Sequence, residues 1–190
     1  MTTSFEMSKV RNRERALCWS ATTEEFGDIQ VDYPVDVRPT AGTGARAHGS
    51  AVPTTLLVGW SIFDDKPRLN GAQLWVDGQE LKLQRNRWAV GRKGRALRMT
   101  QGGAEYRCRA ISRKRYVLTR SGLAVTVTDS GFGTKRRRLR VVINGPAEPV
   151  DVSLAVLFAG ANRSHLTLGG AFRASFSTVF NLFADNAARS

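Results

Sequence analysis

The chain has 190 residues, of which 42% are hydrophobic, and it carries 29 Lys/Arg against 16 Asp/Glu for a formal net charge of +13. This length and hydrophobic content predict one domain with a sizeable core and exclude wholesale disorder. No apolar run reaches the roughly 18 residues that a membrane-spanning helix needs, so we expect no transmembrane span.

The first 50 residues predict an N-terminal arm rather than part of the core. Residues 8–17 are mixed and basic, which indicates a short helix or a frayed end. Residues 29–37 alternate apolar and polar side chains, as a half-buried strand does, and Pro34 places that strand at an edge or a bend. Residues 39–50 are rich in Gly, Ala and Thr and predict a mobile loop. We therefore expect an arm over residues 1–50 with a partial strand and a Gly-rich loop.

Beyond the arm, short alternating segments follow one another at about ten-residue spacing. Turn residues separate them, including Asp77-Gly78, the dipeptide that best indicates a tight hairpin. In Tyr106–Ala110, arginines alternate with apolar side chains, as in a sheet with one wet and one dry face. The pattern predicts a mainly-β domain over residues 51–168, an antiparallel barrel or sandwich. The candidate strands are 54–63, 72–76, 80–85, 87–90, 96–99, 105–111, 115–119, 124–128 and 138–143.

Residues 149–163 form the longest apolar segment. Before its last two residues only Asp151 and Ser153 are clearly polar, and periodicity alone permits a helix or a buried strand. Pro149 suits a first helical turn, and the acidic Glu148 suits a helix N-terminus. As a helix the segment spans roughly 22 Å, short of a roughly 30 Å bilayer core. We expect a central helix over residues 149–163 that the strands enclose.

The last segment, residues 169–190, predicts a C-terminal amphipathic helix. Five apolar side chains recur there at helical spacing, and the apolar stripe that they form would pack on the body of the domain. These residues are Phe172, Phe176, Val179, Phe180 and Phe183.

The positive charge is concentrated in the middle of the chain. Residues 1–71 hold 8 Lys/Arg and 9 Asp/Glu, residues 72–143 hold 18 and 4, and residues 144–190 hold 3 and 3. An excess of this size within 72 residues exceeds what solubility requires and predicts a polyanionic partner. If the basic turns lie on neighbouring hairpin ends, they form one phosphate-binding rim. The candidate anion-binding residues are Arg92, Lys93, Arg95, Arg113, Lys114, Arg115, Lys135, Arg136, Arg137 and Arg138.

Two polyanions fit such a rim, an acidic phospholipid surface and a nucleic acid. Four aromatic residues lie among the charges and could stack on bases, insert at a membrane interface or pack in the core. They are Trp88, Tyr106, Tyr116 and Phe132. The two cysteines, Cys18 and Cys108, lie far apart, which favours a reduced cytoplasmic chain while leaving one disulfide open.

Catalytic patterns in the sequence are sparse. Asp129-Ser130-Gly131 resembles the segment around a chymotrypsin-type nucleophile, and His48 and Asp77 could complete a triad. The flanking glycines of that motif are absent, and the same tripeptide is an ordinary turn. Two His and two Cys, widely separated, have no zinc-ligand spacing. We expect no enzyme, no metal and no cofactor, and keep a serine hydrolase as the least favoured class.

Many short antiparallel strands with basic outer positions, followed by one nearly uniform apolar helix, resemble the tubby C-terminal-like fold. That group includes the tubby, phospholipid scramblase and LURP-one-related families. The resemblance covers about residues 54–163, and residues 148–159 are its best segment, although 27 residues follow residue 163. It implies a closed barrel threaded by a hydrophobic helix and a non-enzymatic role in membrane association or scaffolding. It carries over no binding residue.

Composition and resemblance together predict a non-enzymatic binding or scaffold protein. We expect it to engage acidic phospholipid headgroups through its Arg-rich hairpins, with an RNA- or DNA-binding β-module as the alternative. The expected location is the cytoplasm, with peripheral contact at the inner membrane face.

Overall fold

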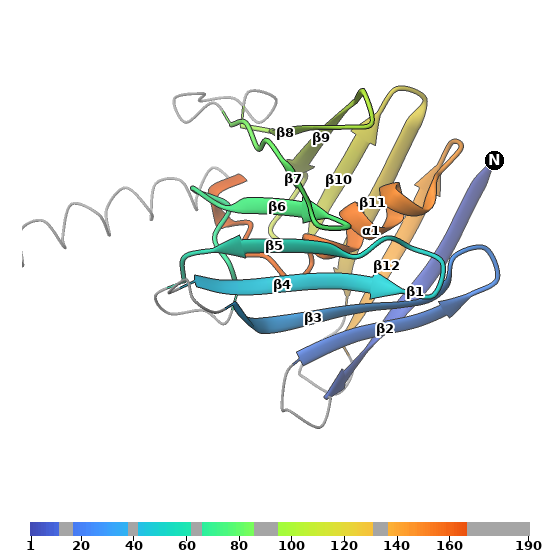
Figure 1. Cartoon of the computed structure of the whole chain (residues 1–190). Helices are drawn as coiled ribbons and strands as arrows, with labels where there is room; N and C mark the ends of the chain where they lie inside the picture. The colour runs from blue at the N-terminus through green and yellow to red at the C-terminus, as the bar shows by residue number, and fades with distance from the viewer. Residues whose placement is uncertain (12–16, 38–41, 62–65, 86–94, 131–136, 167–190) are drawn as a thin grey trace, which may run out of the picture.

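The computed structural model describes residues 1–11, 17–37, 42–61, 66–85, 95–130 and 137–166 (Figure 1). These residues form a single twelve-stranded antiparallel sheet and one α-helix. The strands are β1 (Thr2–Arg11), β2 (Leu17–Thr23), β3 (Gly27–Val37), β4 (Gly42–Gly49), β5 (Thr55–Gly59), β6 (Gln73–Val76), β7 (Gln79–Leu81), β8 (Leu97–Gln101), β9 (Ala104–Ala110), β10 (Arg115–Arg120), β11 (Leu123–Ser130) and β12 (Arg138–Asn144). The helix is α1 (Pro149–Leu157), and a short 3-10 turn, η1 (Ser164–Leu166), follows it.

The sheet curls into a nearly closed up-and-down barrel. Neighbours in sequence are neighbours in the sheet, and β1 pairs with β12 from Thr2↔Asn144 to Ser8↔Arg138. At the remaining joint, between β7 and β8, the described residues form less pairing than at the others. There the described residues form an isolated bridge, in which Gln84 and Arg98 each donate a backbone hydrogen bond to the other, at 2.9 and 2.8 Å. The predicted mainly-β fold, with a helix enclosed by strands, is confirmed.

Helix α1 lies inside this barrel, between β3–β5 on one side and β10–β11 on the other (Figure 1). All seven residues from Asp151 to Leu157 have an exposed fraction of 0%. Burial of so much apolar surface is the main source of stability in such a core. The helix begins as the sequence predicts, because the Glu148 amide donates to the Asp151 carboxylate at 2.6 Å. It ends earlier than residue 163, and turns lead from it to Ala161.

The predicted Gly-rich loop at residues 39–50 is wrong for its described part, because residues 42–49 form the internal strand β4. The physical reason is the helix. Ala45 and Ala47 are fully buried facing the barrel interior, and β4 packs against α1. Small side chains let the helix backbone approach the sheet. A Cβ built on Gly160 would lie 2.8 Å from the Ala45 methyl group, so the contact is close from both sides.

The N-terminal arm is likewise not observed, since β1 to β4 are four strands of the barrel. Met7 and Trp19, on β1 and β2, are buried in its core. Pro34, whose peptide bond with Tyr33 is cis, lies at an irregularity of the strand, because the register between β3 and β4 shifts between Asp32 and Val35. Its strand is internal rather than at an edge. The C-terminal helix predicted over residues 169–190 lies outside the described residues.

The close approach of Gly160, in the turn that follows α1, to Ala45 of β4 generates the first prediction. Replacing Gly160 with Ala adds a methyl group where Ala45 leaves too little room, and overpacking of this kind costs about 1–3 kcal/mol. We expect Gly160→Ala to lower the free energy of unfolding by that amount, measured by chemical denaturation. The double variant Gly160→Ala/Ala45→Gly restores the space, so the two substitutions are expected to couple favourably. If the effects of the two substitutions on the free energy of unfolding simply add, residues 45 and 160 are not in contact.

Candidate anion-binding surface

The structure describes six of the ten predicted anion-binding residues. Arg113, Lys114 and Arg115 are exposed at the turn between β9 and β10. Arg137 and Arg138 lie at the start of β12, the first half-buried and the second exposed. Arg95 departs from the expectation, because it is only 6% exposed and therefore does not belong to an outer surface. Four residues lie outside the described residues: Arg92, Lys93, Lys135 and Arg136.

The two described groups lie on neighbouring hairpin ends, as the sequence hypothesis required. Strand β11 lies between them. On one side, the Asp129 amide donates to the Lys114 carbonyl at 2.8 Å. On the other side, Ser130 is paired with Arg138. The basic turn 113–115 and the start of β12 thus flank the same end of β11, although they lie more than twenty positions apart in sequence.

The outward side of β8–β12 extends this rim into a larger basic surface, which we call the arginine face. Its members alternate with buried apolar side chains along their strands, as in the exposed–buried pattern of β9 and β12. Cross-strand neighbours on one face of a sheet lie close together, and Arg98 is paired directly with Arg107. The arginine face comprises Arg98, Arg107, Arg109, Arg115, Arg138 and Arg140.

Carboxylates are scarce on the arginine face. Arg107 pairs with Glu105 at 3.1 Å, and Arg138 reaches Glu6 of the adjoining β1 at 3.3 Å. Within the described ranges the other four arginines of the face have no carboxylate in ion-pair distance. The hydrogen bond from Arg107 and the positive charges of Arg107 and Arg98 lower the pKa of the exposed Glu105. The surface around this carboxylate is therefore electropositive.

Alternation along the strands sends the aromatic side chains to the opposite side of the sheet. Tyr106 and Tyr116, two of the four aromatic candidates for stacking, are 2% and 1% exposed inside the barrel. The Tyr116 hydroxyl donates to the Ala155 carbonyl of α1 at 2.6 Å, which makes it a core residue. Trp88 and Phe132 lie outside the described residues. Among the strand residues that the structure describes, the arginine face offers charge without an aromatic platform.

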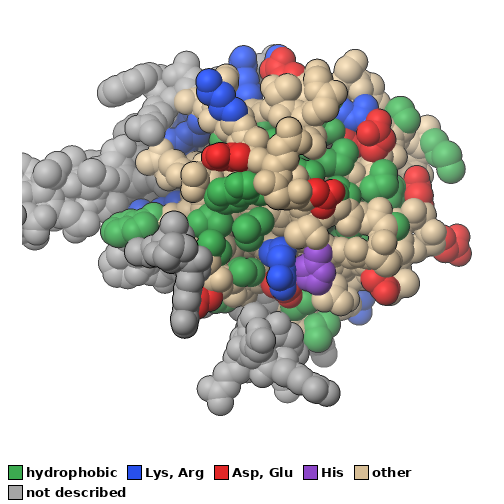
Figure 2. All heavy atoms as spheres, viewed as in Figure 1, with side chains coloured by type: hydrophobic (Ala, Val, Ile, Leu, Met, Phe, Trp, Pro, Cys, Tyr) green, Lys and Arg blue, Asp and Glu red, His purple; other side chains and the backbone are tan. Residues whose placement is uncertain are grey.

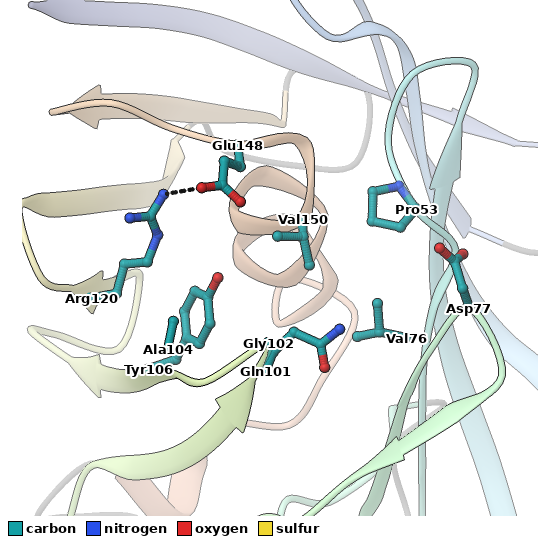
Figure 3. Close-up of a pocket in the computed structure, with 10 residues that line it drawn as sticks. All are labelled: Pro53, Val76, Asp77, Gln101, Gly102, Ala104, Tyr106, Arg120, Glu148 and Val150. Atoms are coloured by element: carbon teal, nitrogen blue, oxygen red, sulfur yellow. Dashed lines mark hydrogen bonds and ion pairs between the residues drawn. The ribbon is translucent and has the colours of Figure 1, made fainter.

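A second candidate site lies where α1 begins. A cavity of about 360 Å³ opens there between the β6–β7 and β8–β9 turns (Figure 3). Its one arginine, Arg120, points toward the helix and is already engaged. The guanidinium makes two hydrogen bonds of 2.8 Å to the Asp151 carboxylate and a longer one of 3.4 Å to Glu148. The cavity is lined by Pro53, Val76, Asp77, Gln101, Gly102, Ala104, Tyr106, Arg120, Glu148 and Val150.

Asp151 is the centre of a buried ionic network at this end of the helix. Its carboxylate also accepts a hydrogen bond from the Tyr106 hydroxyl at 2.8 Å. Burial and the contact with Asp151 raise the pKa of Tyr106, and the hydrogen bonds to Asp151 raise the pKa of Arg120. Tyr106 therefore keeps its proton and Arg120 its charge at neutral pH. The network joins β9, β10 and α1, and Arg120 is the one cationic side chain among the described residues that line the cavity, so we assign the network a structural role.

The serine-hydrolase triad considered from the sequence is not assembled. Ser130 lies at the end of β11 and bonds the Arg138 carbonyl at 3.3 Å. Asp77, in the β6–β7 turn at the opposite end of the barrel, accepts from the Thr54 amide. His48 forms a 2.9 Å hydrogen bond to Asp32 on the outer side of β3 and β4. Within the described segments, no group of three or more His, Cys, Asp or Glu is placed to hold a metal ion.

Comparisons with models of known protein families, with curated proteins and with solved structures find no match to the chain. The resemblance to tubby-like barrels therefore stays a prediction from the sequence. Over the residues that the structure describes, no helix combines the length and the apolar character needed to span a bilayer.

The Asp151 network can be tested by removing its counter-ion. We expect Arg120→Met to lower the free energy of unfolding by about 3–5 kcal/mol, because it leaves a fully buried carboxylate without its charge partner. The matched control Arg109→Met removes an exposed arginine and is expected to change stability by less than about 0.5 kcal/mol. Chemical denaturation measures both. If Arg120→Met and Arg109→Met lower the free energy of unfolding equally, the Asp151 network is not structural.

Both cysteines are free and buried, and burial raises the pKa of Cys18 and of Cys108 to about 12. At pH 8 such a thiol is ionised in about one molecule in ten thousand, so we expect a thiol reagent to label neither residue in the folded protein and both in denaturant. The pKa of each thiol is higher in the folded state than in the unfolded state, near 8.5. The raised pKa of each thiol therefore contributes its full share to the free energy of unfolding below pH 8.5, and this contribution is lost as the pH rises toward 12. Rapid labelling of the folded chain at pH 8 would contradict this burial.

Proposed function

We propose that this protein is a non-enzymatic binding protein that docks reversibly on acidic phospholipid surfaces through its arginine face. The observation that carries the proposal is the concentration of unpaired arginines on one side of the barrel. Arg98, Arg109, Arg115 and Arg140 project outward without a carboxylate partner among the described residues, and the exposed turn residues Arg113 and Lys114 adjoin them.

The rest of the barrel surface has a different character, which supports an oriented approach. The outward positions of β1–β7 carry both signs, with Glu6, Asp28 and Glu80 exposed and Asp32 bonded to Arg46 at 3.1 Å. Figure 2 shows the side on which β4 and β5 lie in front, where acidic and basic side chains are interspersed. A barrel with one strongly basic side turns that side toward a negative surface.

Two considerations favour a lipid surface over a nucleic acid. Single-stranded nucleic acids are held by base stacking in addition to charge, and the described aromatic candidates Tyr106 and Tyr116 are in the core. The architecture also agrees with the resemblance drawn from the sequence, whose implied role is membrane association.

The strength of the interaction follows from the number of contacts. Each Lys or Arg near an anionic membrane contributes about 1 kcal/mol. Four to six residues in simultaneous contact then give about 4–6 kcal/mol, which corresponds to dissociation constants between roughly 1 mM and tens of μM. Binding of this strength is peripheral and reversible, and salt screens it.

Sedimentation with vesicles of neutral lipid, with and without phosphatidylserine, tests the proposal. We expect binding only with the acidic lipid, and we expect Arg115→Gln to weaken it about fivefold, the equivalent of 1 kcal/mol. The triple variant Arg109→Gln/Arg115→Gln/Arg140→Gln is expected to abolish it at physiological salt. Lys82→Gln, which removes an exposed charge beyond β7, serves as the control and is expected to bind like the unmodified protein.

A parallel titration with single- and double-stranded DNA and RNA tests the alternative. If nucleic acid binds at physiological salt and acidic vesicles do not, the lipid proposal is wrong and the same surface is a nucleic-acid interface. If Lys82→Gln weakens vesicle binding as much as Arg115→Gln does, the attraction is generic and the arginine face is not a site.

A further inference from the structure

Three cationic side chains lie at the end of the barrel where α1 finishes, opposite the cavity of Figure 3. Lys66 follows β5, Arg137 precedes β12, and Arg163 follows the helix. The backbone ties the first and last of these together, because the Asn162 amide donates to the Pro67 carbonyl at 2.9 Å. This cluster, which we call the cationic mouth, lines the barrel end and contains none of the six residues of the arginine face, although Arg137 also belongs to the adjoining rim.

Lys66 is held between the helix end and an aromatic ring. Its ammonium donates to the Ala159 carbonyl at 2.8 Å and lies 4.5 Å from the centre of the Tyr33 ring. These contacts use one of three N–H donors and leave two. Burial, and to a lesser extent the positive charges of Arg163 and Arg137, lower the pKa of Lys66 to about 8. The carbonyls that accept hydrogen bonds from Lys66 and Arg163 belong to consecutive residues, Ala159 and Phe158, so these two cations lie side by side at the helix end.

Arg163 and Arg137 have a similar arrangement. The Arg163 guanidinium lies 4.4 Å from the centre of the Tyr116 ring and donates to the Phe158 carbonyl. Arg137 donates to Asp129 at 2.8 Å, and 42% of its side chain stays exposed. A guanidinium has five N–H donors, so each arginine keeps donors for a further partner. The exposed part of Arg137 makes the cluster accessible from the barrel end.

The charges of the cationic mouth do not balance. The C-terminus of a helix carries about half a negative charge, and Asp129 supplies one more, against three cations. Among the residues that the structure describes, this leaves a surplus of about one and a half positive charges in a half-buried place. One lysine or arginine is enough to stabilise the C-terminal end of the helix, so capping does not explain why three cations are present. Partly desolvated like charges of this kind are unfavourable unless an anion joins them.

We propose that Lys66, Arg137 and Arg163 form a binding site for a phosphate group at the cationic mouth. A phosphate monoester carries between one and two negative charges at neutral pH and offers three acceptor oxygens, one for each side chain. The paired N–H donors of an arginine guanidinium match the spacing of two phosphate oxygens, and the lysine ammonium adds a compact positive charge. The site requires no membrane and so stands or falls independently of the arginine face.

Titration with inorganic phosphate at pH 7, with ionic strength held constant by chloride, tests the site. We expect saturable binding of one phosphate per chain, followed by amide chemical shifts or calorimetry. Lys66→Met keeps the packing on Tyr33 and removes the charge, and it is expected to weaken binding at least about tenfold, as loss of a charge-assisted hydrogen bond does. Lys82→Met is the matched control, with the affinity of the unmodified protein. If Lys66→Met does not fold, Arg137→Gln carries the same expectation.

If phosphate does not bind saturably, or if Lys66→Met binds it as tightly as the unmodified protein does, the phosphate-site proposal is wrong. Neither result would change the outcome of the vesicle experiment on the arginine face. Conversely, the triple arginine-face variant is expected to bind inorganic phosphate normally. Vesicles distinguish the source of the phosphate. If Lys66→Met loses binding to phosphatidic acid but not to phosphatidylglycerol, the site takes a lipid monoester headgroup. If it binds both vesicles normally, the site takes free phosphate or a soluble phosphate ester.

Discussion

Enclosing a helix inside a sheet removes its polar groups from water, and each of them then needs a partner within the protein. In α1 these groups are few, and each has one. Asp151 is bonded by Arg120 and Tyr106, and Ser153 bonds the Pro53 carbonyl at 2.7 Å and the Thr55 hydroxyl at 2.9 Å. The two polar residues of the helix are therefore the points at which it is joined to the barrel wall. They fix the direction and depth of a segment whose apolar side chains alone would tolerate sliding.

The same enclosure explains the distribution of charge. Because the interior of the barrel is filled by α1 and by apolar side chains from the strands, the strand arginines have only the outer side available. Alternation along each strand then places them in rows, and the curvature of the sheet presents the rows on one side of the molecule. Enclosure of the helix thus explains why the arginines point outward, and the composition of residues 72–143 explains why they lie on β8–β12.

Much of this could be predicted from the sequence, because the determining patterns are local. The alternation in β9 and β12, the Asp77-Gly78 turn and the caps of α1 each lie within a few residues. Strand β4 could not be predicted in this way, since Ala45 and Ala47 are small to fit a helix more than a hundred positions away. Arg95 was misplaced, and Lys66 and Arg163 were not among the predicted site residues, for a similar reason. Their positions depend on contacts with distant parts of the fold, such as Tyr33 and Tyr116.

The joint between β7 and β8 has a consequence for the motions of the barrel. Every other pair of neighbouring strands shares a ladder of several residues, whereas here the described chain provides the single bridge of Gln84 and Arg98. Local opening in proteins begins where the fewest hydrogen bonds must break. Amide hydrogens at this bridge should therefore exchange with solvent sooner than those of β1 and β12. Opening at this joint would leave the ladder of β1 and β12 intact and would widen the barrel beside the cavity at the start of α1.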